Sequence, residues 1–194
     1  MNKDFIIGLA GKSGSGKDTV GMYIYDFMRY RCKSLKKDSF ANVLKEVFYK
    51  LTGIRTDKDK NKIVSELQIF EDKKELLYDI KDFTKRELLI KTAEAITSVY
   101  GKDFFVNYLF DRHKFTKKLI ITDVRFKNEF KKIREKNGFV VKVVRDNIKS
   151  MDNYTEKDLD NLTNDMYDYV LYNNGNYEDL KRNTISMLET LKLI

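Results

Sequence analysis

Residues 5–19, FIIGLAGKSGSGKDT, carry the pattern that decides the fold. The run FIIGLAG is short, apolar and ended by glycine, which is typical of a buried strand that leads into a loop. From Asp18 to about Arg31, apolar residues recur at the spacing of an amphipathic helix. The sequence therefore predicts a glycine-rich loop between a buried strand and a helix.

The loop itself fits G-x-x-x-x-G-K, the pattern of a phosphate-binding loop. Its glycines let backbone N–H groups point inward, and the helix that follows adds the positive end of its dipole, so the loop attracts polyphosphate. Lys17 can span the β and γ phosphates. The alternative is a glycine-rich turn that happens to precede a helix. We expect the nucleotide-binding residues of this segment to be Gly11, Ser13, Gly14, Ser15, Gly16, Lys17, Asp18 and Thr19.

One position departs from that pattern. Asp18 stands where a serine or threonine usually follows the lysine, and Thr19 comes one place later. The hydroxyl at this position normally ligates magnesium. The sequence leaves open whether Asp18 holds the ion, Thr19 holds it, or a water molecule mediates the contact.

The remainder of the chain alternates between strand and helix patterns. Further strands are predicted at 34–40, 118–124, 139–144 and 168–173. Helices are predicted at 41–51, 128–138 and 177–194, with several helical pieces over 63–110. Strands separated by helices imply parallel crossovers, so the predicted class is α/β, with a parallel sheet and helices on both faces. We expect one domain over 1–194, in which 41–110 is a helical insertion.

Length and composition narrow the class of protein. The 194 residues fit one domain, and the single cysteine, Cys32, excludes a disulfide scaffold or a multi-cysteine zinc site. No run approaches the roughly 18 apolar residues that a membrane helix needs. We therefore expect a cytoplasmic protein without a membrane partner.

The charge balance raises the question of nucleic acid. Lysine and arginine total 38 against 30 acids, which gives a net charge of +8. Coding rich in A and T is an alternative source of this excess. Basic residues recur as KKIREK on a solvated helix face, without the interleaved aromatics of a stacking platform. We expect no polynucleotide partner.

A second chemical signal comes from LIITDVRF, where Asp123 ends an apolar strand. A carboxylate in this place orients hydrated magnesium beside a phosphate loop, although an aspartate that caps a helix or turn is the alternative. Arg125 lies on the same edge, where a guanidinium can contact transferring phosphate oxygens. Lys17, Asp123 and Arg125 are the expected catalytic residues, whereas the single histidine, His113, is expected to be a solvated loop residue.

Five segments together resemble a known family: GKSGSGKDTV, SFANVLKE, RELLIKTAEAITSVYGKDFFV, IITDVRFKNEF and DYVLYNNGNYEDL. They are similar to the deoxynucleoside monophosphate kinases of bacteriophages and related viral or bacterial enzymes. The resemblance covers nearly the whole chain and implies an adenylate-kinase-like fold, with five parallel strands, an acceptor-binding region at 41–110 and a lid at 146–165. It implies Mg²⁺-dependent transfer of the ATP γ-phosphate to a (deoxy)nucleoside monophosphate, in the host cytoplasm if the source is viral.

The same resemblance implies further site residues. Lys45 and Arg86, with Arg125, are expected to bind the acceptor phosphate. Arg145 is expected to close over the donor, or else to be a surface strand end, and Asn173 and Asn174 are expected to seat adenine. Magnesium would be held by Asp18, Thr19 and Asp123.

Two other functions remain open. A phosphate-loop kinase of another acceptor, such as phosphomevalonate or dephospho-CoA, shares this architecture, and a regulatory or nucleic-acid-binding nucleotide switch is a rival from another class. Transfer between two phosphates requires alignment and charge neutralisation rather than acid–base catalysis. A homodimer through the apolar helical insertion is compatible with the sequence.

Overall fold

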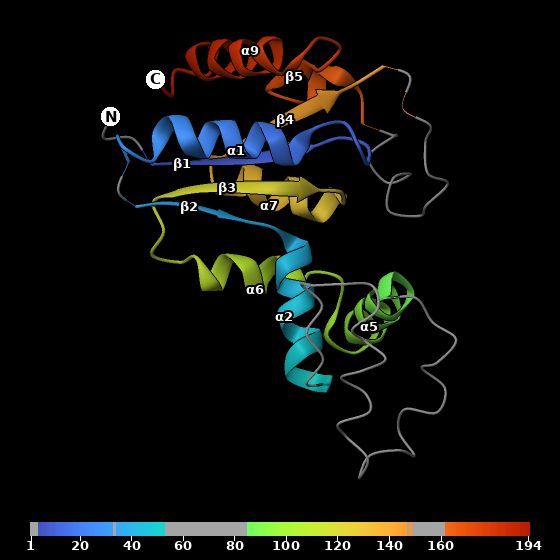
Figure 1. Ribbon diagram of the computed structural model, residues 1–194. Helices are drawn as coiled ribbons and strands as arrows, with labels where there is room; N and C mark the ends of the chain where they lie inside the picture. The colour runs from blue at the N-terminus through green and yellow to red at the C-terminus, as the bar shows by residue number, and fades with distance from the viewer. Residues whose placement is uncertain (1–3, 33, 53–84, 147, 149–161) are drawn as a thin grey trace. The chain divides into compact units, whose positions relative to one another are not determined.

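The computed structural model describes residues 4–32, 34–52, 85–146, 148 and 162–194 (Figure 1). The chain divides into two compact units. The first comprises Met1–Phe40 and Leu109–Ile194, and the second comprises Ala41–Tyr108. The second unit lies within the insertion proposed for residues 41–110.

The first unit is built on a parallel sheet, whose described strands follow the order β2-β3-β1-β4-β5 (Figure 1). These are β1 (Phe5–Ala10), β2 (Leu35–Asp38), β3 (Lys118–Val124), β4 (Phe139–Val144) and β5 (Tyr169–Tyr172). Strand β3 is buried along its whole length and β1 along nearly all of it, which explains their continuous apolar runs. The predicted α/β class with five parallel strands is confirmed.

Helices cover both faces of this sheet (Figure 1). They include α1 (Lys17–Met28), α7 (Lys127–Glu135) and α9 (Tyr177–Thr190). Ile7 and Leu9 of β1 share one buried core with Val20 and Ile24 of α1. Gly8, whose side of the strand is opposite, faces α7, because Ile133 Cδ1 lies 2.5 Å from the place a Cβ would take. Each fully buried aliphatic side chain contributes about 1.5–3 kcal/mol, so the two faces hold the sheet firmly.

The second unit is helical in its described part. It takes in most of α2 (Phe40–Thr52), α5 (Lys85–Tyr100) and the first half of α6 (Phe104–Arg112). Phe48 of α2 packs against Leu88 and Leu89 of α5. Tyr108 of α6 donates to Glu46 at 3.1 Å and accepts from Lys50 at 3.0 Å, so its hydroxyl links α6 to α2.

Several element boundaries differ from those expected. The helix predicted at 41–51 begins at Phe40, because Asp123 Oδ1 accepts the Phe40 N–H at 2.8 Å. The last helix ends at Thr190 rather than at 194, and Lys192 has a φ of 54°. The helical pieces predicted over 63–84 and most of the proposed lid at 146–165 lie outside the described residues.

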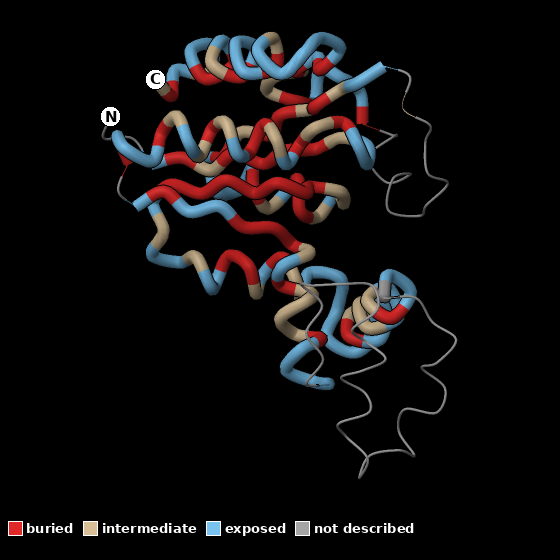
Figure 2. Tube along the Cα trace, viewed as in Figure 1, coloured by how far each residue is buried: buried red, intermediate tan, exposed pale blue. Residues whose placement is uncertain are grey.

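Burial follows this layering. Figure 2 shows buried segments concentrated in the strands and on the sheet-facing sides of the helices. Among the described residues, no helix combines the length and apolarity that would let it cross a bilayer.

Candidate functional site

The glycine-rich loop joins β1 to α1 at the carboxyl end of the sheet. Gly11 has a φ of 141°, and a Cβ on it would lie 2.2 Å from the Val143 carbonyl oxygen of β4. Gly16 is the N-cap of α1 with a φ of 96°, a conformation that favours glycine. The close approach of β4 and the left-handed cap therefore both explain why glycines stand at these two positions.

Hydrogen bonds within the loop curl it around one carbonyl. Lys12 oxygen accepts from the backbone N–H of Ser15 at 3.1 Å and from Lys17 Nζ at 2.7 Å. The Gly16 carbonyl accepts the Val20 N–H at 2.9 Å, which begins the helical ladder. The first N–H groups of a helix have no intrahelical acceptor, so this end of α1 is suited to an anion.

Two polar side chains are buried in this loop. Ser15 is 1% exposed, and its Oγ has no hydrogen-bond partner among the described residues. Lys17 is 7% exposed and carries a charge that burial makes costly unless it is paired. Ser13 and Gly14 are exposed at the tip of the loop. A buried hydroxyl that no described residue contacts by a hydrogen bond, beside a buried ammonium, fits the binding of a polyanion.

The next two residues of α1 differ in exposure. Asp18 is exposed, whereas Thr19 is half-buried. Both belong to the first turn of the helix, and both offer the hard oxygen atoms that Mg²⁺ prefers.

Asp123 lies beside the loop through the register of the sheet. Val124 of β3 pairs with Ala10 of β1, directly before Gly11, so the buried Asp123 lies at the same edge as the loop. Its Oδ1 accepts the N–H of Phe40 at the start of α2. The carboxylate thus caps a helix, as the alternative interpretation held, and it also lies at the edge where the magnesium role requires it.

Arg125 follows two residues later and is half-buried. Its guanidinium has no hydrogen-bond or ion-pair partner among the residues described. Its backbone N–H donates to Glu129 Oε2 at 2.7 Å, and the N–H of Phe126 donates to the same oxygen at 3.0 Å. Glu129 therefore fixes the turn that carries Arg125.

Glu129 is a buried carboxyl that the sequence did not single out. Desolvation, reinforced by the nearby carboxylate of Asp123, raises the pKa of Glu129 to about 8, although the two backbone hydrogen bonds and Arg125 act in the opposite direction. The signal that could have found it is the spacing D-V-R-F-x-N-E, in which the glutamate stands in the first turn of α7.

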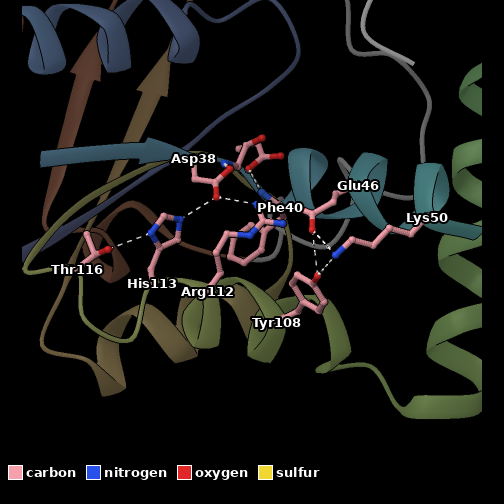
Figure 3. A network of polar contacts seen from close by, with 10 residues as sticks. Asp38, Phe40, Glu46, Lys50, Tyr108, Arg112, His113 and Thr116 are labelled. Atoms are coloured by element: carbon pink, nitrogen blue, oxygen red, sulfur yellow. Dashed lines mark hydrogen bonds and ion pairs between the residues drawn. The ribbon is translucent and has the colours of Figure 1, made fainter. Parts of the chain in front are cut away.

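A second unforeseen group surrounds Asp38 at the carboxyl end of β2 (Figure 3). The buried carboxylate accepts from Arg112 Nη1 at 3.1 Å and from His113 Nε2 at 2.8 Å, while Oδ1 accepts the Ser39 N–H at 2.8 Å. His113 Nδ1 lies 3.2 Å from Thr116 Oγ1. The expectation of a solvated His113 is wrong, because its side chain is 12% exposed and paired.

The residues proposed for the donor base and for donor closure lie near the loop in the first unit. Asn173 is buried and Asn174 is exposed, both directly after β5. Arg145 is exposed directly after β4, with no hydrogen-bond or ion-pair partner in the described part of the chain.

The residues proposed for the acceptor phosphate lie in the second unit. Lys45 is half-buried on α2, and its ammonium has no partner within the described ranges. Arg86 is exposed in the first turn of α5.

In chemical terms, the sheet edge gathers groups for a charged ligand. Ser15 and Lys17 at the helix start and the guanidinium of Arg125 suit phosphate oxygens, whereas Asp123 and the first turn of α1 suit a hard cation. Among the described residues, no three His, Cys, Asp or Glu side chains cluster as a metal site.

Comparisons with known proteins agree on a family. A sequence model of the deoxynucleotide monophosphate kinase family matches residues 34–184. A protein of Acanthamoeba polyphaga mimivirus, provisionally named a deoxynucleotide monophosphate kinase, is 28% identical over 202 residues, which cover 95% of this chain and 96% of that protein.

Solved structures are similar in fold. A dephospho-CoA kinase from Campylobacter jejuni has a TM-score of 0.50 and 13% identity, with 96% of each chain covered. A gluconokinase from Sinorhizobium meliloti 1021 has a TM-score of 0.50 and 11% identity, with 98% of this chain and 95% of that chain covered. At these identities the likeness concerns the fold alone.

Proposed function

Because the chain belongs to the deoxynucleotide monophosphate kinase family and is a phosphotransferase, we propose that it transfers the γ-phosphate of ATP to a deoxynucleoside monophosphate. The observation that carries the proposal is the start of α1. There the buried Ser15 hydroxyl, which has no hydrogen-bond partner in the described part of the chain, lies with the buried Lys17 ammonium and the helix N-terminus. Such a site is complementary to a donor triphosphate.

Charge neutralisation is the main task of the site. Lys17 would contact the donor phosphates from within the loop, and Arg125 would contact the transferring group from the turn after β3. The support for Arg125 is its half-buried guanidinium, which has no hydrogen-bond or ion-pair partner among the described residues, since such a group is strongly attracted to phosphate oxygens. No proton acceptor is required for a phosphate nucleophile, so the proposal assigns no acid–base role to His113.

Mg²⁺ is proposed as the metal, with Asp18, Thr19 and Asp123 as the residues that would hold it directly or through water. Their oxygens match the preference of this ion. When bound, the ion supplies charge neutralisation between the donor phosphates. Asp123 would hold the ion, directly or through water, while its hydrogen bond from the Phe40 N–H keeps the carboxylate in place.

The acceptor is proposed to bind the helical unit. Lys45 and Arg86 would hold the acceptor monophosphate, and the support for Lys45 is its half-buried ammonium without a partner in the described residues. On this proposal residues 41–110 form the acceptor-binding insertion of a single kinase domain, and residues 146–165 form its lid.

An ADP-release assay across acceptors tests the reaction. Purified protein would be incubated with ATP and Mg²⁺ and with deoxynucleoside monophosphates, ribonucleoside monophosphates, phosphomevalonate and dephospho-CoA in separate reactions. We expect release that depends on at least one deoxynucleoside monophosphate. Turnover with phosphomevalonate or dephospho-CoA and with none of the nucleotides would contradict the proposed acceptor.

A further inference from the structure

The loop after β5 contacts the phosphate loop through the side chain of Asn173. This residue is 7% exposed, and its Nδ2 donates to the Ser15 carbonyl oxygen at 2.9 Å. Its backbone N–H donates to the Val144 carbonyl at 2.7 Å, which ties the same residue to the end of β4. The amide is thus in contact with the phosphate loop on one side while its backbone is fixed on the other.

Close packing accompanies these hydrogen bonds. A Cβ on Gly16 would lie 2.4 Å from Asn173 Nδ2, so the amide lies directly against the N-cap of α1. The glycine is required by both its φ of 96° and this contact. Asn173 therefore defines one wall of the turn from which the N-terminus of α1 starts.

The hydrogen bond from Asn173 satisfies the Ser15 carbonyl of the phosphate loop. When the N–H groups of a loop point inward, its carbonyl groups point outward. Buried carbonyl groups need hydrogen-bond donors, so such a loop requires donors on its outer side. Asn173 supplies that partner for Ser15 with a neutral donor, so it adds no charge beside the anion site. An aspartate of the same size would instead place acceptor oxygen against acceptor oxygen.

Asn174 makes a reciprocal pair with Asp146. Its Oδ1 accepts the backbone N–H of Asp146 at 2.8 Å, and its Nδ2 donates to Asp146 Oδ2 at 2.7 Å. Asp146 directly follows Arg145, whose guanidinium has no partner in the described part of the chain. The two bonds fix the backbone that carries this arginine.

We infer that Asn173 and Asn174 are positioning residues for the donor, a role separate from the adenine contact that the family resemblance implies. Asn173 holds the phosphate loop in its triphosphate-binding shape, and Asn174 holds the backbone that directs Arg145. Two adjacent residues thereby fix the positions of both the phosphate loop and the backbone of Arg145. This inference rests on the proposed binding of ATP.

The first test replaces Asn173 by leucine, which is similar in size but lacks the donor. We expect the dissociation constant for ATP, measured by calorimetry, to rise about tenfold, the scale of one buried hydrogen bond, with the KM for the acceptor unchanged. Asn173→Ala, which also lacks the donor and adds no charge, should give at least the same effect if the leucine variant does not fold. The matched control is Asn183→Leu. Asn183 lies on α9, and its Nδ2 donates to the carbonyl of Tyr172, the last residue of β5, in an exposed hydrogen bond of 3.3 Å.

The outcomes separate this inference from the proposed function. Unchanged ATP affinity in the Asn173 variants, or equal losses for donor and acceptor, would overturn the positioning role. If the unaltered protein takes up no ATP, the proposed function fails first.

A double-mutant cycle tests the second asparagine. Asn174→Ala should lower kcat/KM for ATP several-fold in the unaltered background and have no further effect in an Arg145→Ala background, because the asparagine acts through the arginine. An effect that persists without Arg145, or no effect in either background, would overturn that part of the inference.

Discussion

At the scale of single residues, Lys17 is the position where we expect a substitution to lower activity most. Its ammonium is buried at the start of α1 and donates to a carbonyl of its own loop. We predict that Lys17→Met lowers kcat by about 10²–10³-fold, the usual loss when one preorganised electrostatic donor is removed. Steady-state kinetics would measure this, with the exposed Lys37 of β2 replaced by methionine as a control of equal charge change. Similar losses in both variants would contradict a specific role for Lys17.

Glu129 predicts a pH dependence of stability. Its pKa is about 8 in the folded protein against 4.5 in the unfolded chain, so the folded state binds the proton more tightly between these values. The stability that Glu129 contributes is therefore full below about pH 4.5 and is lost as the pH rises through about 8.

The comparison that isolates this effect is Glu129→Gln, which resembles the protonated acid. Urea unfolding at pH 5.5, 7 and 8.5 should show the unaltered protein losing a few kcal/mol relative to the glutamine variant, since one pKa unit corresponds to about 1.4 kcal/mol. Parallel stability profiles for the two proteins would mean that the carboxyl does not titrate in this range.

At the scale of secondary-structure elements, Asp38 joins the end of β2 to the end of α6 (Figure 3). Asp38→Ala should reduce the free energy of unfolding by about 1.5–3 kcal/mol, because it leaves the partly buried donors of Arg112 and His113 without their charged acceptor. Asp26, which pairs with Arg29 at 3.6 Å on the exposed face of α1, provides the control. Its alanine variant should lose less than about 1 kcal/mol. Equal losses in urea unfolding would show that burial of the Asp38 group carries no special weight.

The cap of α9 gives a second prediction at this scale. Asn176 Oδ1 accepts the N–H groups of Glu178 and Asp179, and Asp179 Oδ2 accepts the Asn176 N–H in return. Asn176→Ala should therefore cost about 1 kcal/mol in the free energy of unfolding. Asn176 follows residues 173–174 but makes no described contact with the phosphate loop. The KM of the Asn176→Ala variant for ATP should therefore equal that of the unaltered protein. A raised KM would implicate α9 in donor binding.

These elements also show what the sequence can and cannot predict. Periodicity located β1, α1, β3 and β4 closely, because buried strands and amphipathic helices leave local patterns. The start of α2 was misplaced by one residue, since its cap comes from Asp123, far away in the chain. The Asp38–His113 pair cannot be predicted from sequence for the same reason. The two residues are 75 positions apart, and no local spacing indicates that they are partners.

Glu129 shows a different kind of limit. In the sequence it looks like an ordinary acid in the first turn of a helix, and only the fold makes it a buried carboxyl near Asp123. The phosphate loop, in contrast, could be located from residues 11–17 alone, because its function requires glycines and a lysine at fixed spacing. Whether Lys45, Arg86 and Arg145 contact phosphate stays a prediction.

At the scale of the whole molecule, a ligand that binds only the folded state must stabilise it. ATP at 100 times its dissociation constant adds about 2.7 kcal/mol, and each kcal/mol raises the Tm of a chain of this size by about 2–4 °C. We therefore predict a rise in Tm of about 5–10 °C in a thermal unfolding scan with ATP and Mg²⁺. Lys17→Met should lose most of this rise. A Tm that ATP leaves unchanged at saturating concentration would argue against a donor site in the first unit.

Transfer of labelled phosphate tests the central claim most directly. The unaltered protein would be incubated with ATP labelled at the γ-phosphate, Mg²⁺ and each of the four common deoxynucleoside monophosphates, and the nucleotides would then be separated by chromatography. The phosphate loop, Asp123 and Arg125 together predict label in a deoxynucleoside diphosphate, in amounts equal to the ADP formed. Label that stays in ATP, or that appears only as inorganic phosphate with every acceptor, would contradict the account.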